Sequence, residues 1–256
     1  EHYAIDAGVG SHGVMLERLL TDGKTEAGIY ASAYRLLDAS NMLGFLFAGL
    51  LLPMFARMIK QATSITSLLQ LSFQMIWIGS LALSMATYLY REEIMFLLYT
   101  EATPYWGEIL GHLMWTFVAV STAYIYGTLL TANGNVRVMN ITFLAGVVLN
   151  VLLNLILIPQ YKAMGAVIAT LITQYFVTIA LVVLVQRVFR LSPNVPYLLK
   201  ISGFTVLYIG SAWLLHQQLS VHWFISFCLI GLLSLPFAFL LRLLNVSALL
   251  SILQSR

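Results

Sequence analysis

The chain has 256 residues, of which 60% are hydrophobic and only 9% are charged, with a formal net charge of +3. A soluble domain carries about 25% charged residues, so this composition excludes an ordinary water-soluble protein. The basic residues form no run or basic–aromatic patch, which excludes a nucleic-acid partner. The single cysteine, Cys228, excludes an internal disulfide and a cysteine-based metal site. The sequence therefore predicts a membrane protein surrounded by the lipid bilayer.

Apolar segments of about 20 residues, the length that crosses roughly 30 Å of hydrocarbon, recur along the chain. They are apolar on all sides, whereas the helices of soluble proteins carry one apolar stripe. The segments predict an all-α, polytopic transmembrane bundle of about seven spans: 28–55, 68–90, 114–130 (with an alternative start at residue 106), 139–158, 166–188, 197–215 and 223–244.

The remaining segments are too short or too polar to cross a bilayer. Residues 93–99 predict a short interfacial helix between the second and third spans. Residues 1–25 predict a truncated or partly disordered opening helix and outer loop, which precedes the helical bundle at 26–256. We expect the chain to begin partway through a longer protein, because it opens without a methionine or a signal peptide.

The charged residues separate when the loops are assigned alternately to two sides. One side receives eight basic residues and no acid: Arg57, Lys60, Arg137, Arg187, Arg190, Lys200, Arg242 and Arg256. The other side receives four basic and seven acidic residues: Arg18, Lys24, Arg91, Lys162, Glu17, Asp22, Glu26, Glu92, Glu93, Glu101 and Glu108. Because cytoplasmic loops are rich in lysine and arginine, the first side and the C-terminus are predicted to be cytoplasmic.

The first span carries polar residues where they are costly. The spacing i, i+4, i+8, i+11 places four of them on one helix face: Tyr30, Tyr34, Asp38 and Asn41. Arg35 is three residues from Asp38 and can pair with it. A charge near the bilayer centre costs at least about 2.5–3.5 kcal/mol, so such residues normally face a bundle interior or a wet cavity. These five residues predict the wall of a substrate or ion pathway, and the alternative is a structural Arg–Asp pair that locks helices together.

Polar residues also lie in the fourth and fifth spans. Asn150 and Asn154 share one helix face, and Thr170, Thr173 and Gln174 lie within the next span. Such groups commonly form hydrogen bonds between helices worth about 0.6–2 kcal/mol each. We interpret Asn150, Asn154 and Gln174 as helix contacts, with substrate contact as the alternative.

Small residues spaced four apart predict close helix approaches at Gly107 with Gly111 and at Gly165 with Ala169. The motif GxGxxG at residues 8–13 has no surrounding βαβ unit, so a dinucleotide site is not expected. The histidines lack metal-ligand spacing, and no nucleophile–base pair or carboxylate pair lies within a span. We therefore expect no enzyme, no bound metal and no cofactor.

Three segments resemble the family of bacterial polysaccharide and O-antigen flippases within the MATE-like flippase superfamily. The first is EAGIYASAYRLLDASNMLGFLFAGLLLPMFARMI at 26–59, which matches a G-I-Y-x-x-A-Y-R-L-L-D helix that ends in L-P-x-F. The second is LIPQYKAMGAVIATLITQ at 157–174, where an I-P is followed by G-A-x-x-A-T. The third, VMLERLLTDG at 14–23, is similar to the end of the helix that opens the family's second half.

The resemblance implies one lobe of a two-lobed, MATE-like transporter in a bacterial cytoplasmic (inner) membrane. Its partner would be the missing N-terminal bundle of the same protein, without which we expect no transport. The implied substrate is a polyprenyl-diphosphate-linked oligosaccharide, flipped from the inner to the outer leaflet and driven by a coupling proton or sodium ion. Four of the polar residues of the first span match the family's helix motif: Tyr30, Tyr34, Arg35 and Asp38.

Three alternatives remain open. A multidrug exporter or a peptidoglycan lipid-precursor flippase of the same superfamily fits the same spans. A membrane glycosyltransferase or polymerase usually needs long outer loops with catalytic acids or arginines, and the longest loop here holds only Arg91 and four glutamates. A truncated product without function is the third alternative.

Overall fold

The computed structural model describes residues 13–192, 194–219, 221–241 and 243, and these residues form helices without any strand. The helices are α2 (Gly23–Lys60), α3 (Thr66–Leu89), α4 (Arg91–Leu98), α5 (Pro104–Ala132), α6 (Val136–Val188), α7 (Val195–Gln218) and α8 (Trp223–Leu240). Residues 13–19 form a further helical segment before α2. The predicted all-α bundle is therefore confirmed.

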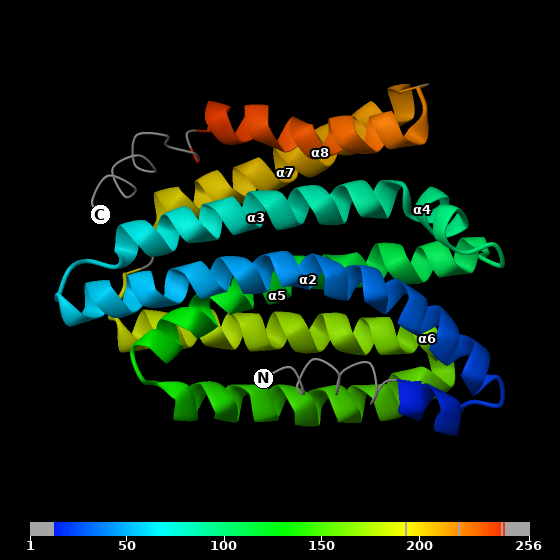
Figure 1. Ribbon diagram of the computed structural model, residues 1–256, viewed down its shortest axis with the longest axis horizontal. Coiled ribbons are helices and arrows are strands. Elements are labelled where there is room, and N and C mark those ends of the chain that lie inside the picture. Colours follow the sequence, from blue (N-terminus) through cyan, green and yellow to red (C-terminus); the bar gives the residue numbers. More distant parts are fainter. Residues whose placement is uncertain (1–12, 193, 220, 242, 244–256) are drawn as a thin grey trace.

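Helix α6 consists of two helices that lie side by side, as Figure 1 shows. The chain reverses at Lys162, whose backbone angles (φ 54°, ψ −134°) are not helical, three residues after Pro159. Across the reversal, Asn150 Nδ2 donates to Thr173 Oγ1 at 3.3 Å. Six helices of the described part of the chain are long and apolar enough to cross a membrane. One of them is α6, whose 53 residues include both arms of the reversal. Since α6 supplies two spans, the seven predicted spans are present, and the chain is a multi-pass membrane protein.

Several helices are longer than the predicted spans. Helix α2 covers 38 residues, from Gly23 to Lys60, and α5 begins at Pro104, close to the earlier of its two predicted starts. The interfacial helix predicted at 93–99 is α4. Residues 1–12 of the opening segment, most of the GxGxxG motif and the predicted end of the last span at 244 lie outside the described residues.

The alternating helices bring the charged residues to two opposite ends (Figure 1). The basic end holds six described basic residues and no described acid: Arg57, Lys60, Arg137, Arg187, Arg190 and Lys200. The acidic end holds the start of α2, helix α4, the start of α5, the reversal of α6 and the loop between α7 and α8. Arg242 and Arg256 lie outside the described residues. The predicted separation of charge is therefore present, while the side of the membrane that each end faces stays a prediction.

Helix α5 is the centre of the bundle and packs against α2, α3, α4 and α6. Ser84 on α3 donates to the Met114 carbonyl at 2.7 Å, and Thr178 on α6 donates to the Ala119 carbonyl at 2.9 Å. Gly111 confirms the predicted close approach, because a Cβ there would lie 2.5 Å from Arg91 Cδ. Helices α7 and α8 pack on α3 (Figure 1).

Candidate functional site

The depth of the polar residues on α2 follows from how α2 lies against α5. Tyr105, at the start of α5, donates to Glu26 at 3.0 Å across a separation of 79 residues. Further along, Gly44 lies against Ser121 and Tyr124, which shows that the two helices run in the same direction. With this offset Asp38 is level with Phe117, near the middle of α5 (Pro104–Ala132). Asp38 therefore lies near the middle of the bundle's depth, and Arg35 lies one turn closer to the acidic end.

Two residues of the predicted stripe are buried inside the bundle. Tyr30 is fully buried, and its hydroxyl is 3.1 Å from Thr170 Oγ1 on α6. Its ring lies 5.8 Å from the ring of Tyr34. Asn41 is also buried, and its Oδ1 has no hydrogen-bond partner within the described residues. The positions of Tyr30 and Asn41 favour roles in packing α2, and their predicted contact with substrate stays a prediction.

The other polar residues of the span are covered only in part. Arg35 is exposed and Asp38 is half-buried, and no ion pair joins them among the described contacts. Asp38 instead interacts electrostatically with the hydroxyl groups of Tyr34 and Tyr124. The alternative of a structural Arg–Asp pair is therefore not what the structure contains. We call Tyr34, Arg35, Asp38 and Tyr124 the polar face.

The sequence pattern does not single out Tyr124. It lies on α5, and nothing in its local sequence links it to Asp38. The available signal is a tyrosine deep within an apolar span, two residues after the polar pair Ser121 and Thr122. The structure places Tyr124 close enough to Asp38 for an electrostatic interaction between the two side chains.

The secondary polar residues connect the two arms of α6. Asn154 Nδ2 donates to Asn150 Oδ1 at 2.8 Å, and Asn150 donates in turn to Thr173. This network matches the interpretation of Asn150 and Asn154 as helix contacts. Gln174 is half-buried beside Thr173, and its backbone carbonyl accepts a hydrogen bond from Thr178 Oγ1 at 2.7 Å.

An ionic cluster at the acidic end holds three helices together. Lys162, at the reversal of α6, pairs with Asp22 at 2.5 Å and lies 3.7 Å from Glu26. Glu26 is buried and accepts hydrogen bonds from the Tyr105 hydroxyl and from the Ala163 N–H at 3.1 Å. The hydrogen bond from Lys162 lowers the pKa of the Asp22 carboxyl, which therefore stays ionised at neutral pH. The start of α2 is fixed here, about two to three turns before the polar face begins at Tyr34.

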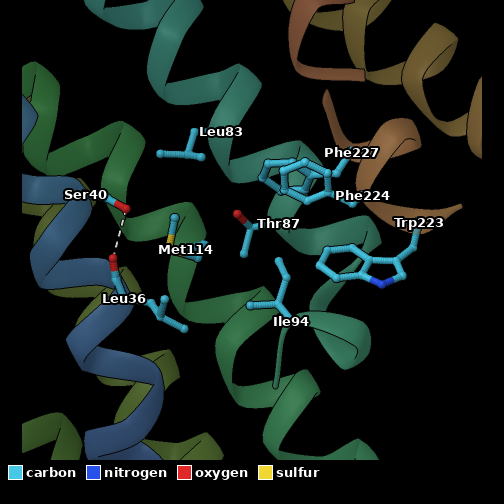
Figure 2. Close-up of a pocket in the computed structure, with 9 residues that line it drawn as sticks. All are labelled: Leu36, Ser40, Leu83, Thr87, Ile94, Met114, Trp223, Phe224 and Phe227. Carbon is cyan, nitrogen blue, oxygen red and sulfur yellow. Dashed lines mark hydrogen bonds between the residues drawn. The ribbon is translucent and has the colours of Figure 1, made fainter. Parts of the chain in front are cut away.

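A different face of α2 lines a small apolar cavity of about 230 Å³, shown in Figure 2. Leu36 and Ser40 of α2 face Met114 of α5 and Phe227 of α8 across it, and Thr87 contributes a hydroxyl. The Ser40 hydroxyl donates to the Leu36 carbonyl at 2.9 Å, so it leaves the cavity wall mainly apolar. Helix α2 therefore separates a polar face from an apolar cavity.

The described residues contain no group of three or more histidine, cysteine, aspartate or glutamate side chains that could hold a metal ion. No family model matches the chain, and no curated protein matches it either. The family assignment therefore stays a prediction from the sequence motifs.

Proposed function

We propose that this chain is the C-terminal lobe of a transporter that flips a polyprenyl-diphosphate-linked oligosaccharide across the bacterial cytoplasmic membrane. The observation that carries the proposal is the position of Arg35, an exposed arginine on a membrane-spanning helix near the middle of the bundle, which forms no ion pair with any described residue. A charge at that depth is stable only beside water or a polar partner, which favours a hydrated cavity between two lobes.

The residues of the polar face have separate roles in this proposal. Arg35 binds the diphosphate, because its planar guanidinium forms paired hydrogen bonds to phosphate oxygens. Tyr34 and Tyr124 present rings and hydroxyl groups to the sugars. Asp38 is the candidate site for the coupling proton or sodium ion. The cavity lined by Leu36 and Phe227 offers apolar space for a segment of the polyprenyl chain.

The charge separation supports an orientation for this transporter. The basic end, with Arg57, Lys60 and Arg137, faces the cytoplasm because cytoplasmic loops are rich in basic residues. The acidic end then faces outward. Helix α2 starts at this end, and an odd number of spans follows from there, so the C-terminus lies in the cytoplasm. In this proposal the lobe works by rocking against an N-terminal lobe, so it does not transport alone.

Deletion of the gene for the full-length protein tests the proposal. We expect lipid-linked oligosaccharide to accumulate on the inner leaflet and surface polysaccharide to disappear, because assembly continues while flipping stops. The full-length gene restores the surface polymer, whereas this chain alone does not.

Other outcomes of the deletion separate the alternatives. Normal surface polysaccharide with increased drug sensitivity means a multidrug exporter, and loss of cell-wall precursor on the outer leaflet means a peptidoglycan-precursor flippase. Unpolymerised repeat units on the outer leaflet mean a polymerase. Each of these results contradicts the proposal.

A further inference from the structure

A second, larger groove lies near the acidic end between α3, α5 and α7. Its volume is about 480 Å³, within the range of small-ligand sites. Its lining includes Tyr88, His112, Trp115, Ile209, Gly210 and Trp213. Trp213 is 52% exposed, so the groove opens on the surface of the lobe.

The groove is separate from the polar face. Helix α5 contributes His112 and Trp115 to the groove, whereas it contacts α2 through Ser121 and Tyr124. The groove runs from Tyr88, one residue before the end of α3, down to Trp115 on α5, so only its Tyr88 edge lies at the acidic end, where lipid headgroups lie in a membrane-spanning protein. Any ligand bound in the groove is therefore separate from the proposed transport pathway at the polar face.

A carboxylate lies beside the groove: Glu108 is one helical turn before the lining residue His112 on α5. Glu108 Oε1 accepts hydrogen bonds from Arg91 Nε at 3.2 Å and from Arg91 Nη2 at 2.6 Å. Arg91 also donates to the Tyr88 carbonyl at 2.9 Å and lies 4.9 Å from the centre of the Tyr88 ring. The Glu108 Oε2 atom is 3.5 Å from His112 Nδ1, too far for a strong hydrogen bond. Oε2 therefore keeps its capacity to accept a hydrogen bond from a ligand.

We propose that the groove binds the ammonium headgroup of phosphatidylethanolamine. The ammonium donates to Glu108 Oε2, and the rings of Trp115 and Trp213 stabilise its charge by cation–π interaction. Carboxylates outnumber basic residues at this end, which favours a cationic group over an anionic one. Ile209 and Met85 provide the apolar wall for the glycerol backbone and the first carbons of the acyl chains.

Lipid binding by the purified protein tests this site by native mass spectrometry. The probes are phosphatidylethanolamine and phosphatidylglycerol with identical acyl chains, supplied together in detergent. We expect the protein to retain phosphatidylethanolamine about five-fold more than phosphatidylglycerol, which lacks the ammonium group.

Two variants locate the binding. Gly210→Trp fills the groove, because a Cβ at Gly210 meets no heavy atom within 4 Å, and we expect the preference to disappear. Gly203→Trp is the matched control: Gly203 lies on the same helix, a Cβ there also meets no heavy atom within 4 Å, and it does not line the groove. Trp213→Ala, at a half-exposed side chain, should also reduce retention and leaves the fold intact.

Three results overturn the proposal. The first is equal or greater retention of phosphatidylglycerol, which means that Arg91 and His112 dominate recognition. The second is an unchanged preference in Gly210→Trp, which places the lipid elsewhere. The third is retention of neither lipid by the unmodified protein.

Discussion

Replacing Arg35 by alanine in the full-length protein lowers the rate of flipping about 30-fold, the effect of losing roughly 2 kcal/mol of charge-assisted hydrogen bonding to the diphosphate. Protein levels and thermal stability stay near those of the parent, because Arg35 is exposed and forms no ion pair with another described residue. The rate is measured as the clearance of labelled lipid-linked oligosaccharide from the inner leaflet.

Arg57→Ala is the matched control for this variant. Arg57 is also an exposed arginine of α2, but it lies at the basic end, away from the polar face. We expect Arg57→Ala to flip at the parental rate and Arg35→Lys to flip at an intermediate rate, because an ammonium cannot form the paired hydrogen bonds of a guanidinium. A collapse of protein levels in Arg35→Ala would mean that the arginine stabilises the fold, which is incompatible with a pathway role.

The second large effect is expected at the reversal of α6. A Cβ at Gly165 would overlap the Leu157 carbonyl and lie 2.9 Å from Ile158 N, so the obstacle is backbone and not a movable side chain. Overpacking against movable side chains costs typically about 1–3 kcal/mol, and we expect Gly165→Leu to cost more than about 3 kcal/mol. The variant should show a much lower melting temperature in detergent and little protein in the membrane.

Gly203→Leu is the control for Gly165→Leu. Gly203 is a helical glycine with open space around it, so the same side chain enters without overlap. Its melting temperature should stay within a few degrees of the parent. If Gly165→Leu melts at the parental temperature, the two arms of α6 do not pack as closely at Gly165 as the structure describes.

The fold was largely predictable because the bilayer restricts the choices. Hydrocarbon thickness fixes the length of a span, so apolar blocks alone locate the seven crossings, and the charges follow the alternation of the loops. The tight reversal of α6 could be predicted only in part from the sequence. Pro159 and Gly165 indicate a break, but local sequence does not predict the positive φ angle at Lys162 or its contacts with Asp22 and Glu26, which are distant in the chain.

The polar face was less predictable, since the rotation of a helix within a bundle is decided by packing. The three-residue spacing of Arg35 and Asp38 allows an ion pair, yet the rotation of α2 exposes Arg35 and brings Asp38 to Tyr124. Tyr30 shares the predicted stripe with Asp38, but α6 covers it and its hydroxyl bonds to Thr170. Periodicity identifies the residues that share a face and does not identify which part of that face is covered.

Water access to α2 tests the central claim most directly. In full-length protein with Cys228 replaced by alanine, Met42→Cys lies one turn from Asp38 at a position that is 60% exposed, and Leu232→Cys on α8 is equally exposed at 59%. A charged, membrane-impermeant thiol reagent should modify Met42→Cys quickly, and lipid-linked oligosaccharide should slow that reaction, while Leu232→Cys in lipid stays unmodified. If both cysteines stay unmodified, the polar face of α2 meets lipid and lines no hydrated pathway.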